Sequence, residues 1–310
     1  MLNRRDFLRK AAMGAGLLTT GAFPFRALAA GTETRLTILH TNDTHSRLEP
    51  FPMDGSKMQG QGGVAARAAV IEQIREEEEH VLLLDAGDVF QGTPYFNMYR
   101  GEAEIKAMSL MGYDAMTMGN HDFDIGVEGF ALQLPHARFA VVTSNYDFTG
   151  TALEGKTVPY RIFRKGNVKI GIFGLGIDLN GIVPAAAFGR TRYLDPIAVA
   201  RSVSEDLRKK QRCDMVICLS HLGFKYDFNK VSDHVIARET EFVDLIIGGH
   251  THTFLDHPVA VKNRAGNDVL INQVGWGGLR LGKLDFIFDS KKNTKRFNAQ
   301  TVFPGKQTIG

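Results

Sequence analysis

The sequence predicts a layered α/β domain, because short strand-like segments alternate with amphipathic helical segments along most of the chain. The strand-like segments are almost continuously apolar, which is typical of strands buried on both faces. They comprise residues 36–39, 81–84, 115–118, 215–219 and 243–247. The helical segments place apolar side chains on one side and charged side chains on the other, and they comprise residues 64–79, 102–111 and 196–210.

The pattern changes after residue 255, where strand-like segments follow one another without long helices between them. Residues 259–262, 269–274 and 283–288 predict a more antiparallel sheet that completes the same domain. A chain of 310 residues is long enough for one large domain or two small ones. Because the sequence shows no internal repeat and no low-complexity linker, we expect one domain over residues 30–310.

The formal net charge of +3 comes from the first 29 residues, which hold five basic residues and one acidic residue. The remainder has 32 basic and 33 acidic residues, a balance of −1. A composition that is 44% hydrophobic and 23% charged is that of an ordinary globular protein. The main domain therefore shows no global charge that favours binding to nucleic acid, and we expect no nucleic-acid partner.

Residues 1–29 have the three parts of an export signal. Arg4 and Arg5 begin a basic segment, residues 11–23 are modestly apolar, and residues 27–29 are a small-residue cleavage site. This segment resembles a bacterial Tat signal peptide, although Asn3 precedes the arginines and Arg9 stands where lysine is usual. It predicts a periplasmic or otherwise exported protein; a short membrane anchor and a chance basic start are the alternatives. Nothing after residue 30 approaches the ~18 apolar residues of a spanning helix, so we expect no membrane span after cleavage.

Polar clusters follow the five strand-like segments of the α/β region. Loops at strand ends converge in α/β folds, so we expect these clusters to meet. Asp43 and His45 are two residues apart, as are His250 and His252, and in extended segments each pair faces one side. Mixed nitrogen and oxygen donors suit Zn, Mn, Fe or Co and suit Ca poorly. The sequence predicts a site for two divalent cations, with the ligands Asp43, His45, Asp88, Asn120, His221, His250 and His252.

The motifs around these residues are specific in their order and spacing. They are Leu-His-Thr-Asn-Asp-Thr-His at 39–45, Asp-Ala-Gly-Asp-Val-Phe-Gln-Gly-Thr at 85–93 and Gly-Asn-His-Asp-Phe-Asp at 119–124. At these positions the chain resembles the calcineurin-like metallophosphoesterase superfamily, and most closely the catalytic domain of bacterial 5′-nucleotidases and UDP-sugar hydrolases. The resemblance implies a four-layer αββα sandwich. It also assigns Asp43, His45, Asp88 and His252 to one metal, and Asp88, Asn120, His221 and His250 to the other.

The resemblance also implies a reaction, the hydrolysis of a phosphomonoester such as a 5′-nucleotide by a hydroxide that bridges two metals. His121 is the candidate to stabilise or protonate the leaving oxygen, and Asp124 is expected to orient its ring. We expect Asp122 to hold the loop, and Asn42 and Asp85 either to support the ligands from outside or to stabilise the loops.

Several alternatives remain open at the level of sequence. Within enzymes they are phosphodiesterase or cyclic-nucleotide hydrolysis, UDP-sugar hydrolysis and thiosulfate-ester hydrolysis; a scaffold with structural metals is the alternative outside enzymes. Full-length 5′-nucleotidases of this family carry a C-terminal domain that recognises the nucleotide, whereas this chain ends at Gly310. We therefore expect a small phosphorylated substrate. One alternative is a catalytic domain that acts alone on a broader set of phosphoesters. The favoured hypothesis is that a separately encoded domain of that type docks on a flat apolar surface beside the metal loops.

Overall fold

A computed structural model describes residues 33–291 and 294–305. From Glu33 onward the chain forms one compact unit, and the predicted signal at residues 1–29 lies outside the described residues. Within the described part of the chain, no helix has the length and apolarity needed to cross a membrane.

The first sheet brings three of the predicted site loops to one edge. Its order is β14–β13–β1–β2–β3–β4, and β1 to β4 are parallel, so the loops that follow β1, β2 and β3 leave the same edge. β13 pairs antiparallel with β1 and with β14. The strands are β1 (Thr34–Thr41), β2 (Val81–Asp85), β3 (Ala115–Met116), β4 (Ala140–Val141), β13 (Leu281–Phe288) and β14 (Thr294–Val302).

The second sheet supplies the other two loops. Its order is β11–β12–β10–β9–β7–β6, with β7, β9, β10 and β12 parallel and the edge strands β6 and β11 antiparallel. The strands are β6 (Tyr160–Lys165), β7 (Val168–Leu175), β9 (Met215–Ser220), β10 (Leu245–Gly248), β11 (Val259–Lys262) and β12 (Asp268–Asn272). β5 (Tyr146–Asp147) and β8 (Arg192–Tyr193) form a separate short pair.

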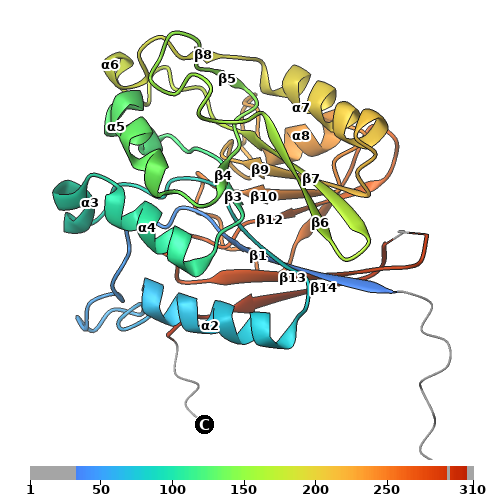
Figure 1. Ribbon diagram of the computed structural model, residues 1–310, viewed down its shortest axis with the longest axis horizontal. Helices are drawn as coiled ribbons and strands as arrows, with labels where there is room; N and C mark the ends of the chain where they lie inside the picture. The colour runs from blue at the N-terminus through green and yellow to red at the C-terminus, as the bar shows by residue number, and fades with distance from the viewer. Residues whose placement is uncertain (1–32, 292–293, 306–310) are drawn as a thin grey trace, which may run out of the picture. The chain divides into compact units, whose positions relative to one another are not determined.

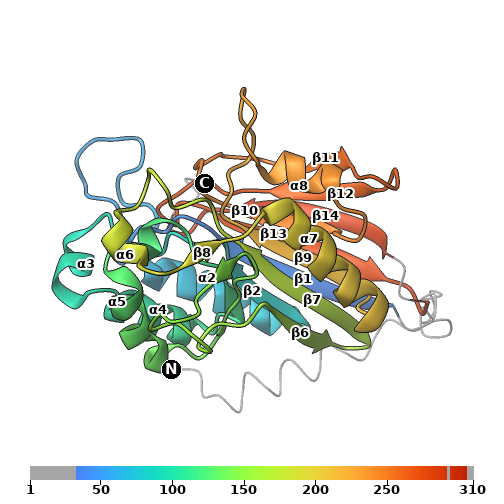
Figure 2. The ribbon, with the colours of Figure 1, turned by 90° about the horizontal axis from the view of Figure 1, so that it is seen from above.

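Three apolar clusters divide the domain into four layers. The middle cluster lies between the sheets and joins side chains such as Leu36 and Leu82 of the first sheet to Ile170 and Ile217 of the second. Alternate residues of the same strands point outward, as Leu39 does, and are covered by helices. The structure therefore confirms the αββα sandwich (Figures 1 and 2).

The helices fall into two outer groups. α2 (Val64–Glu77), α4 (Glu102–Met111) and α5 (Gly126–Gln133) contribute to the cluster outside the first sheet, and α7 (Pro196–Glu205) and α8 (Asp233–Glu239) to the cluster outside the second. The shorter helical elements are α3 (Pro94–Tyr99), η1 (His121–Phe123), η2 (Leu134–His136), α6 (Ala185–Phe188) and η3 (Asp206–Lys210), the last of which is a π-helix. The helix expected at 196–210 thus changes type after Glu205.

The strands after residue 255 do not form a sheet of their own, so this part of the prediction was wrong. β11 and β12 extend the second sheet, β13 and β14 extend the first, and β12 pairs in parallel with β10. The physical reason is that both sheets have an open edge next to a site strand, and each edge is covered by a late segment of the chain. Only the mainly antiparallel character was predicted correctly.

Candidate metal centre

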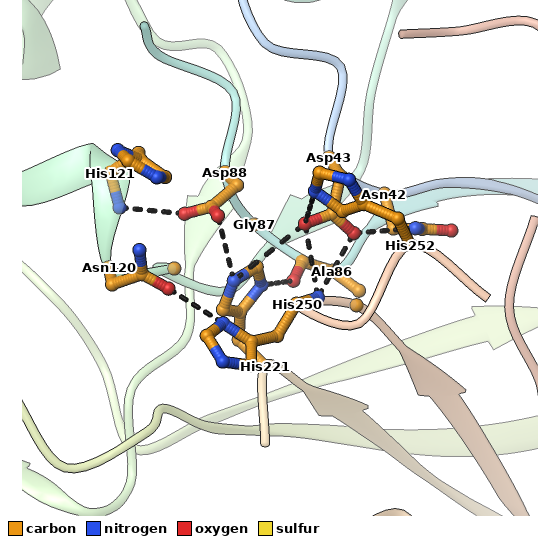
Figure 3. Close-up of polar contacts among 12 residues, drawn as sticks. Asn42, Asp43, Ala86, Gly87, Asp88, Asn120, His121, His221, His250 and His252 are labelled. Atoms are coloured by element: carbon orange, nitrogen blue, oxygen red, sulfur yellow. Dashed lines mark hydrogen bonds and ion pairs between the residues drawn. The ribbon is translucent and has the colours of Figure 1, made fainter. Parts of the chain in front are cut away.

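All seven predicted ligands lie together where the loops after β1, β2, β3, β9 and β10 converge. Figure 3 labels all of these ligands except His45. Their backbone departs from the extended conformation expected from sequence. Asp43, His45, Asp88, His250 and His252 all have a positive φ, between 48° and 72°. Residues other than glycine rarely have a positive φ. Those that do are often found at functional sites, where the surrounding structure holds the backbone in this conformation. The pairs Asp43/His45 and His250/His252 therefore enter the site through left-handed backbone, not through short extended segments.

The first ligand group consists of Asp43, His45 and His252, whose donor atoms all lie within 4.8 Å of one another. His252 Nε2 is 3.3 Å from Asp43 Oδ1 and 3.0 Å from His45 Nε2. His250, only two residues away, does not join this group. The backbone N–H of His250 instead donates to the Asp43 carboxylate at 3.0 Å, which ties the β10 loop to the β1 loop.

The second ligand group consists of Asp88, His221 and His250, also within 4.8 Å. His221 Nε2 is 3.1 Å from Asp88 Oδ2, and the same oxygen is 4.0 Å from His45 Nε2 in the first group. Asp88 therefore faces both groups. Asn120 Oδ1 lies 2.8 Å from His250 Nδ1, at the outer side of the second group.

The chemistry of these donors fits divalent cations. His221 is fully buried, and its Nε2 forms no hydrogen bond of normal geometry although Asp88 lies beside it. Burial alone lowers the pKa of His221, but Asp88 and Asp43 raise it overall to about 10, so the site attracts positive charge strongly. Buried carboxylate oxygens together with converging imidazole nitrogens are the donor set expected for Zn, Mn, Fe or Co. Their assignment as ligands nevertheless stays a prediction.

A shell of hydrogen bonds orients the ligand side chains. His221 Nδ1 lies 2.7 Å from the Ala86 carbonyl, and His45 Nδ1 lies 3.3 Å from the Phe90 carbonyl. Asn42 donates to Asp43 Oδ2 at 2.6 Å. Such bonds fix the ring tautomer and raise the basicity of the donor atom.

The buried carboxylates Asp85 and Asp122 shape the loops as expected. Asp85 accepts a hydrogen bond from the Thr41 hydroxyl at 2.5 Å and one from the Gly87 N–H at 2.8 Å. Asp122 accepts four backbone N–H groups, those of Asp88, Val89, Phe90 and Gly119. It thereby joins the β2 loop to the β3 loop. Burial, and then the charge of Asp88, raises the pKa of Asp122 to about 7.

We expect Asp122→Ala to lower the free energy of unfolding by about 3 kcal/mol or more, because each buried N–H left unpaired costs about 1–3 kcal/mol. Urea denaturation of the metal-free protein measures this effect. Asp124→Ala is the matched control: Asp124 is two residues away and bonds to a single side chain. Equal stability of the two variants would show that Asp122 does not hold the loop.

His121 and Asp124 form the expected pair beside the centre. His121 Nδ1 is 2.9 Å from Asp124 Oδ2, and the His121 backbone N–H donates to Asp88 Oδ1 at 2.7 Å. The hydrogen bond with Asp124 is the main cause that raises the pKa of His121. The His121 ring also lies edge to face with His45, at 5.4 Å between centroids. The pair is partly exposed, so a substrate can reach it.

Sequence reasoning missed the turn at 275–278, which lies against the first ligand group. The Gly277 N–H donates to the Asp43 carbonyl at 2.7 Å, and the Trp276 ring stacks on His252. The available signal was the motif Gly-Trp-Gly-Gly, which holds the single tryptophan of the chain between residues suited to positive φ.

Similarity to known proteins agrees with this site. A family model described as calcineurin-like phosphoesterase matches residues 36–254. The chain is 36% identical over 319 residues to a snake venom 5′-nucleotidase from Gloydius brevicauda, covering 94% of this chain and 52% of that protein. The structure of a 5′-nucleotidase precursor from Thermus thermophilus matches with a TM-score of 0.78 at 36% identity, over 87% of this chain and 54% of that chain.

The NAD nucleotidase of Haemophilus influenzae also matches, with a TM-score of 0.75 at 28% identity, over 87% of this chain and 51% of that chain. The chain thus spans about half the length of these relatives. Residues 36–254, which the family model matches, contain every predicted site residue, and the relatives confirm the resemblance inferred from the motifs. By its fold, its motifs and its relatives, the chain belongs to the calcineurin-like phosphoesterase family.

Proposed function

We propose that this protein hydrolyses phosphomonoesters in the manner of a 5′-nucleotidase, with two divalent cations. One observation carries the proposal: Asp88 faces two ligand groups at once and also accepts the backbone N–H of His121. This arrangement supports two cation sites beside a histidine–carboxylate pair. The similarity to 5′-nucleotidases from snake venom and from Thermus thermophilus supports the substrate class.

In this proposal Asp43, His45, Asp88 and His252 hold one cation, and Asp88, Asn120, His221 and His250 hold the other. Cations bound there supply activation of water and neutralisation of phosphate charge. His121 Nδ1 is engaged by Asp124, so the opposite nitrogen of the ring is the one that faces a leaving oxygen and gives it a proton or a hydrogen bond.

Two further parts of the proposal concern the export of the protein and a partner domain. The twin-arginine segment supports export by the Tat pathway with cleavage after residue 29. A partner domain equivalent to the other half of the relatives is supported by their length. It is also supported by the exposed side chains of Phe228 and Phe254, which follow the loops that carry His221 and His252.

The test is a substrate panel on the protein lacking residues 1–29, stripped with chelator and reconstituted with Mn²⁺, Zn²⁺ or Co²⁺. We expect hydrolysis of 5′-nucleotides only after metal addition. A second candidate, cleavage of a dinucleotide, is favoured by the similarity to the NAD nucleotidase, so NAD joins the panel beside a UDP-sugar and a diester. Full activity after chelation, or activity on the diester alone, would contradict the proposal.

Lys230 is expected to strengthen substrate binding. It lies on the loop between β9 and α8, with its ammonium 4.7 Å from the centre of the Tyr226 ring. Burial, and then the charge of His221, lowers the pKa of His250 to about 4. The charge of Lys230 adds a smaller effect in the same direction, which supports an electrostatic influence of this cation on the second group. We expect Lys230→Met to raise KM about tenfold at low salt, because a nearby cation attracts phosphate dianions.

Lys225→Met is the matched control, since Lys225 lies on the same loop but its charge acts on His234. The two variants have equal net charge, so KM as a function of ionic strength separates a local effect from a global one. Identical KM values for both variants would remove Lys230 from substrate binding.

A further inference from the structure

The four histidines of the centre are not held equally. His221 and His45 each have Nδ1 close to a backbone carbonyl, and His250 Nδ1 lies 2.8 Å from Asn120 Oδ1. The polar contacts of His252 involve only Nε2, and no hydrogen bond to its Nδ1 is found within residues 33–291 and 294–305. Its side chain is also 40% exposed, against 0% for His221 and 9% for His45. By hydrogen bonding, His252 is the least restrained of the four.

A stacking contact takes the place of the missing hydrogen bond. The rings of His252 and Trp276 are stacked, with centroids 6.0 Å apart and an angle of 16° between their planes. Phe51 packs edge to face against Trp276 at 5.5 Å, and the Arg47 guanidinium lies 4.3 Å from the centre of the Phe51 ring. A continuous series of ring contacts therefore leads away from the ligand group, through His252, Trp276 and Phe51 to the partly exposed Arg47.

The backbone beneath Trp276 is fixed to the ligand loops. The Gly277 N–H donates to the Asp43 carbonyl, and Asn42 donates to the Gly275 carbonyl at 2.6 Å while accepting the Val274 N–H at 2.9 Å. The Gly275 N–H donates to the Thr253 carbonyl at 3.0 Å, next to His252. Trp276 thus has little freedom to move away from His252, which is what a stacking support requires.

We propose that Trp276 is a positioning residue that sets the metal affinity of the Asp43–His45–His252 group by fixing the His252 ring. The inference rests on the proposed two-metal function and goes beyond it, because it makes the two sites unequal. The Asp88–His221–His250 group binds the first cation tightly. The Asp43–His45–His252 group binds the second more weakly and exchanges it. The single tryptophan lies against the exchangeable site only, and so reports its occupancy.

The test is a titration of metal-stripped protein with Mn²⁺, followed by calorimetry, metal analysis and tryptophan fluorescence. We expect two binding steps, and quenching of Trp276 by the paramagnetic ion in the second step only, with Zn²⁺ giving two steps and weaker quenching. In Trp276→Ala the first step is unchanged and the dissociation constant of the second rises about 10–100-fold, the usual cost of losing an outer support of a metal ligand. Trp276→Phe, which keeps an aromatic ring, restores the affinity.

Phe51→Ala provides an independent variant that keeps the fluorescent residue; it is expected to weaken the second step in the same direction. Thermal unfolding of the metal-free variants checks that each is folded. Two equally tight steps in Trp276→Ala, or a variant that raises KM without changing metal binding, would overturn the inference while leaving the proposed function intact. Wild-type protein that binds fewer than two ions would overturn both.

Discussion

Asp88→Asn is expected to leave less than one divalent cation per chain and to lower phosphomonoesterase activity by at least about 10²–10³-fold, the scale of removing one electrostatic group from a transition state. The reason is the position of the carboxylate, 3.1 Å from His221 Nε2 and 4.0 Å from His45 Nε2, where it serves both ligand groups. An amide at this position has no charge and one oxygen. Elemental analysis after dialysis against Mn²⁺ measures the metal content, and a colorimetric phosphate assay measures the activity.

Asp85→Asn separates this effect from the general cost of changing a buried carboxylate. Asp85 lies three residues earlier, is equally buried and binds Thr41 and Gly87 rather than a ligand group. We expect Asp85→Asn to bind two ions and to lose stability only. Two ions and wild-type activity in Asp88→Asn would remove Asp88 from its proposed bridging role.

The convergence of the site was predictable because it depends on strand order alone. Five apolar segments were each followed by a polar cluster, and parallel strands send their loops to one edge, so Asp43, Asp88 and Asn120 were expected to meet. How the side chains reach the site was not predictable. Asp43 and His45 converge through left-handed backbone with φ of 50° and 48°, which a spacing of two residues does not indicate.

Two strands of the second sheet and the support of His252 escaped prediction for different reasons. β7 is an interior strand of its sheet, but glycines at 171 and 174 interrupt its apolar pattern; they are needed because Leu207 and the Val142 carbonyl approach its backbone closely. β6 is an edge strand with weak apolarity and without a fully buried residue. The stack of Trp276 on His252 depends on β12 lying beside β10, a pairing that the sequence placed in a different sheet.

The second large effect concerns His121, whose removal is expected to lower the rate without removing metal. Its side chain contacts Asp124 and the ring of the ligand His45. The hydrogen bond to the ligand Asp88 comes from its backbone N–H, so alanine preserves that bond. We expect His121→Ala to bind two ions and to lose about 10²–10⁴-fold in kcat, the usual contribution of a general acid or of a group that stabilises charge. The loss should be smaller for a substrate whose leaving group is a weak base, such as p-nitrophenyl phosphate, because that leaving group needs little protonation.

Asp124→Asn tests the same pair through pH. The hydrogen bond with Asp124 is the main cause that raises the pKa of His121, so its loss lowers that pKa and the protonated ring disappears at lower pH. The alkaline limb of the pH–rate profile should therefore move toward acid in Asp124→Asn, with metal content unchanged. In His121→Ala the alkaline limb of the pH–rate profile that reports the His121 pKa should be absent. Because Asp124 acts through His121, adding Asp124→Asn to His121→Ala should lower kcat little further. Additive losses in the double variant would show that the two residues act separately, and a wild-type rate in metal-loaded His121→Ala would exclude the histidine from the chemistry.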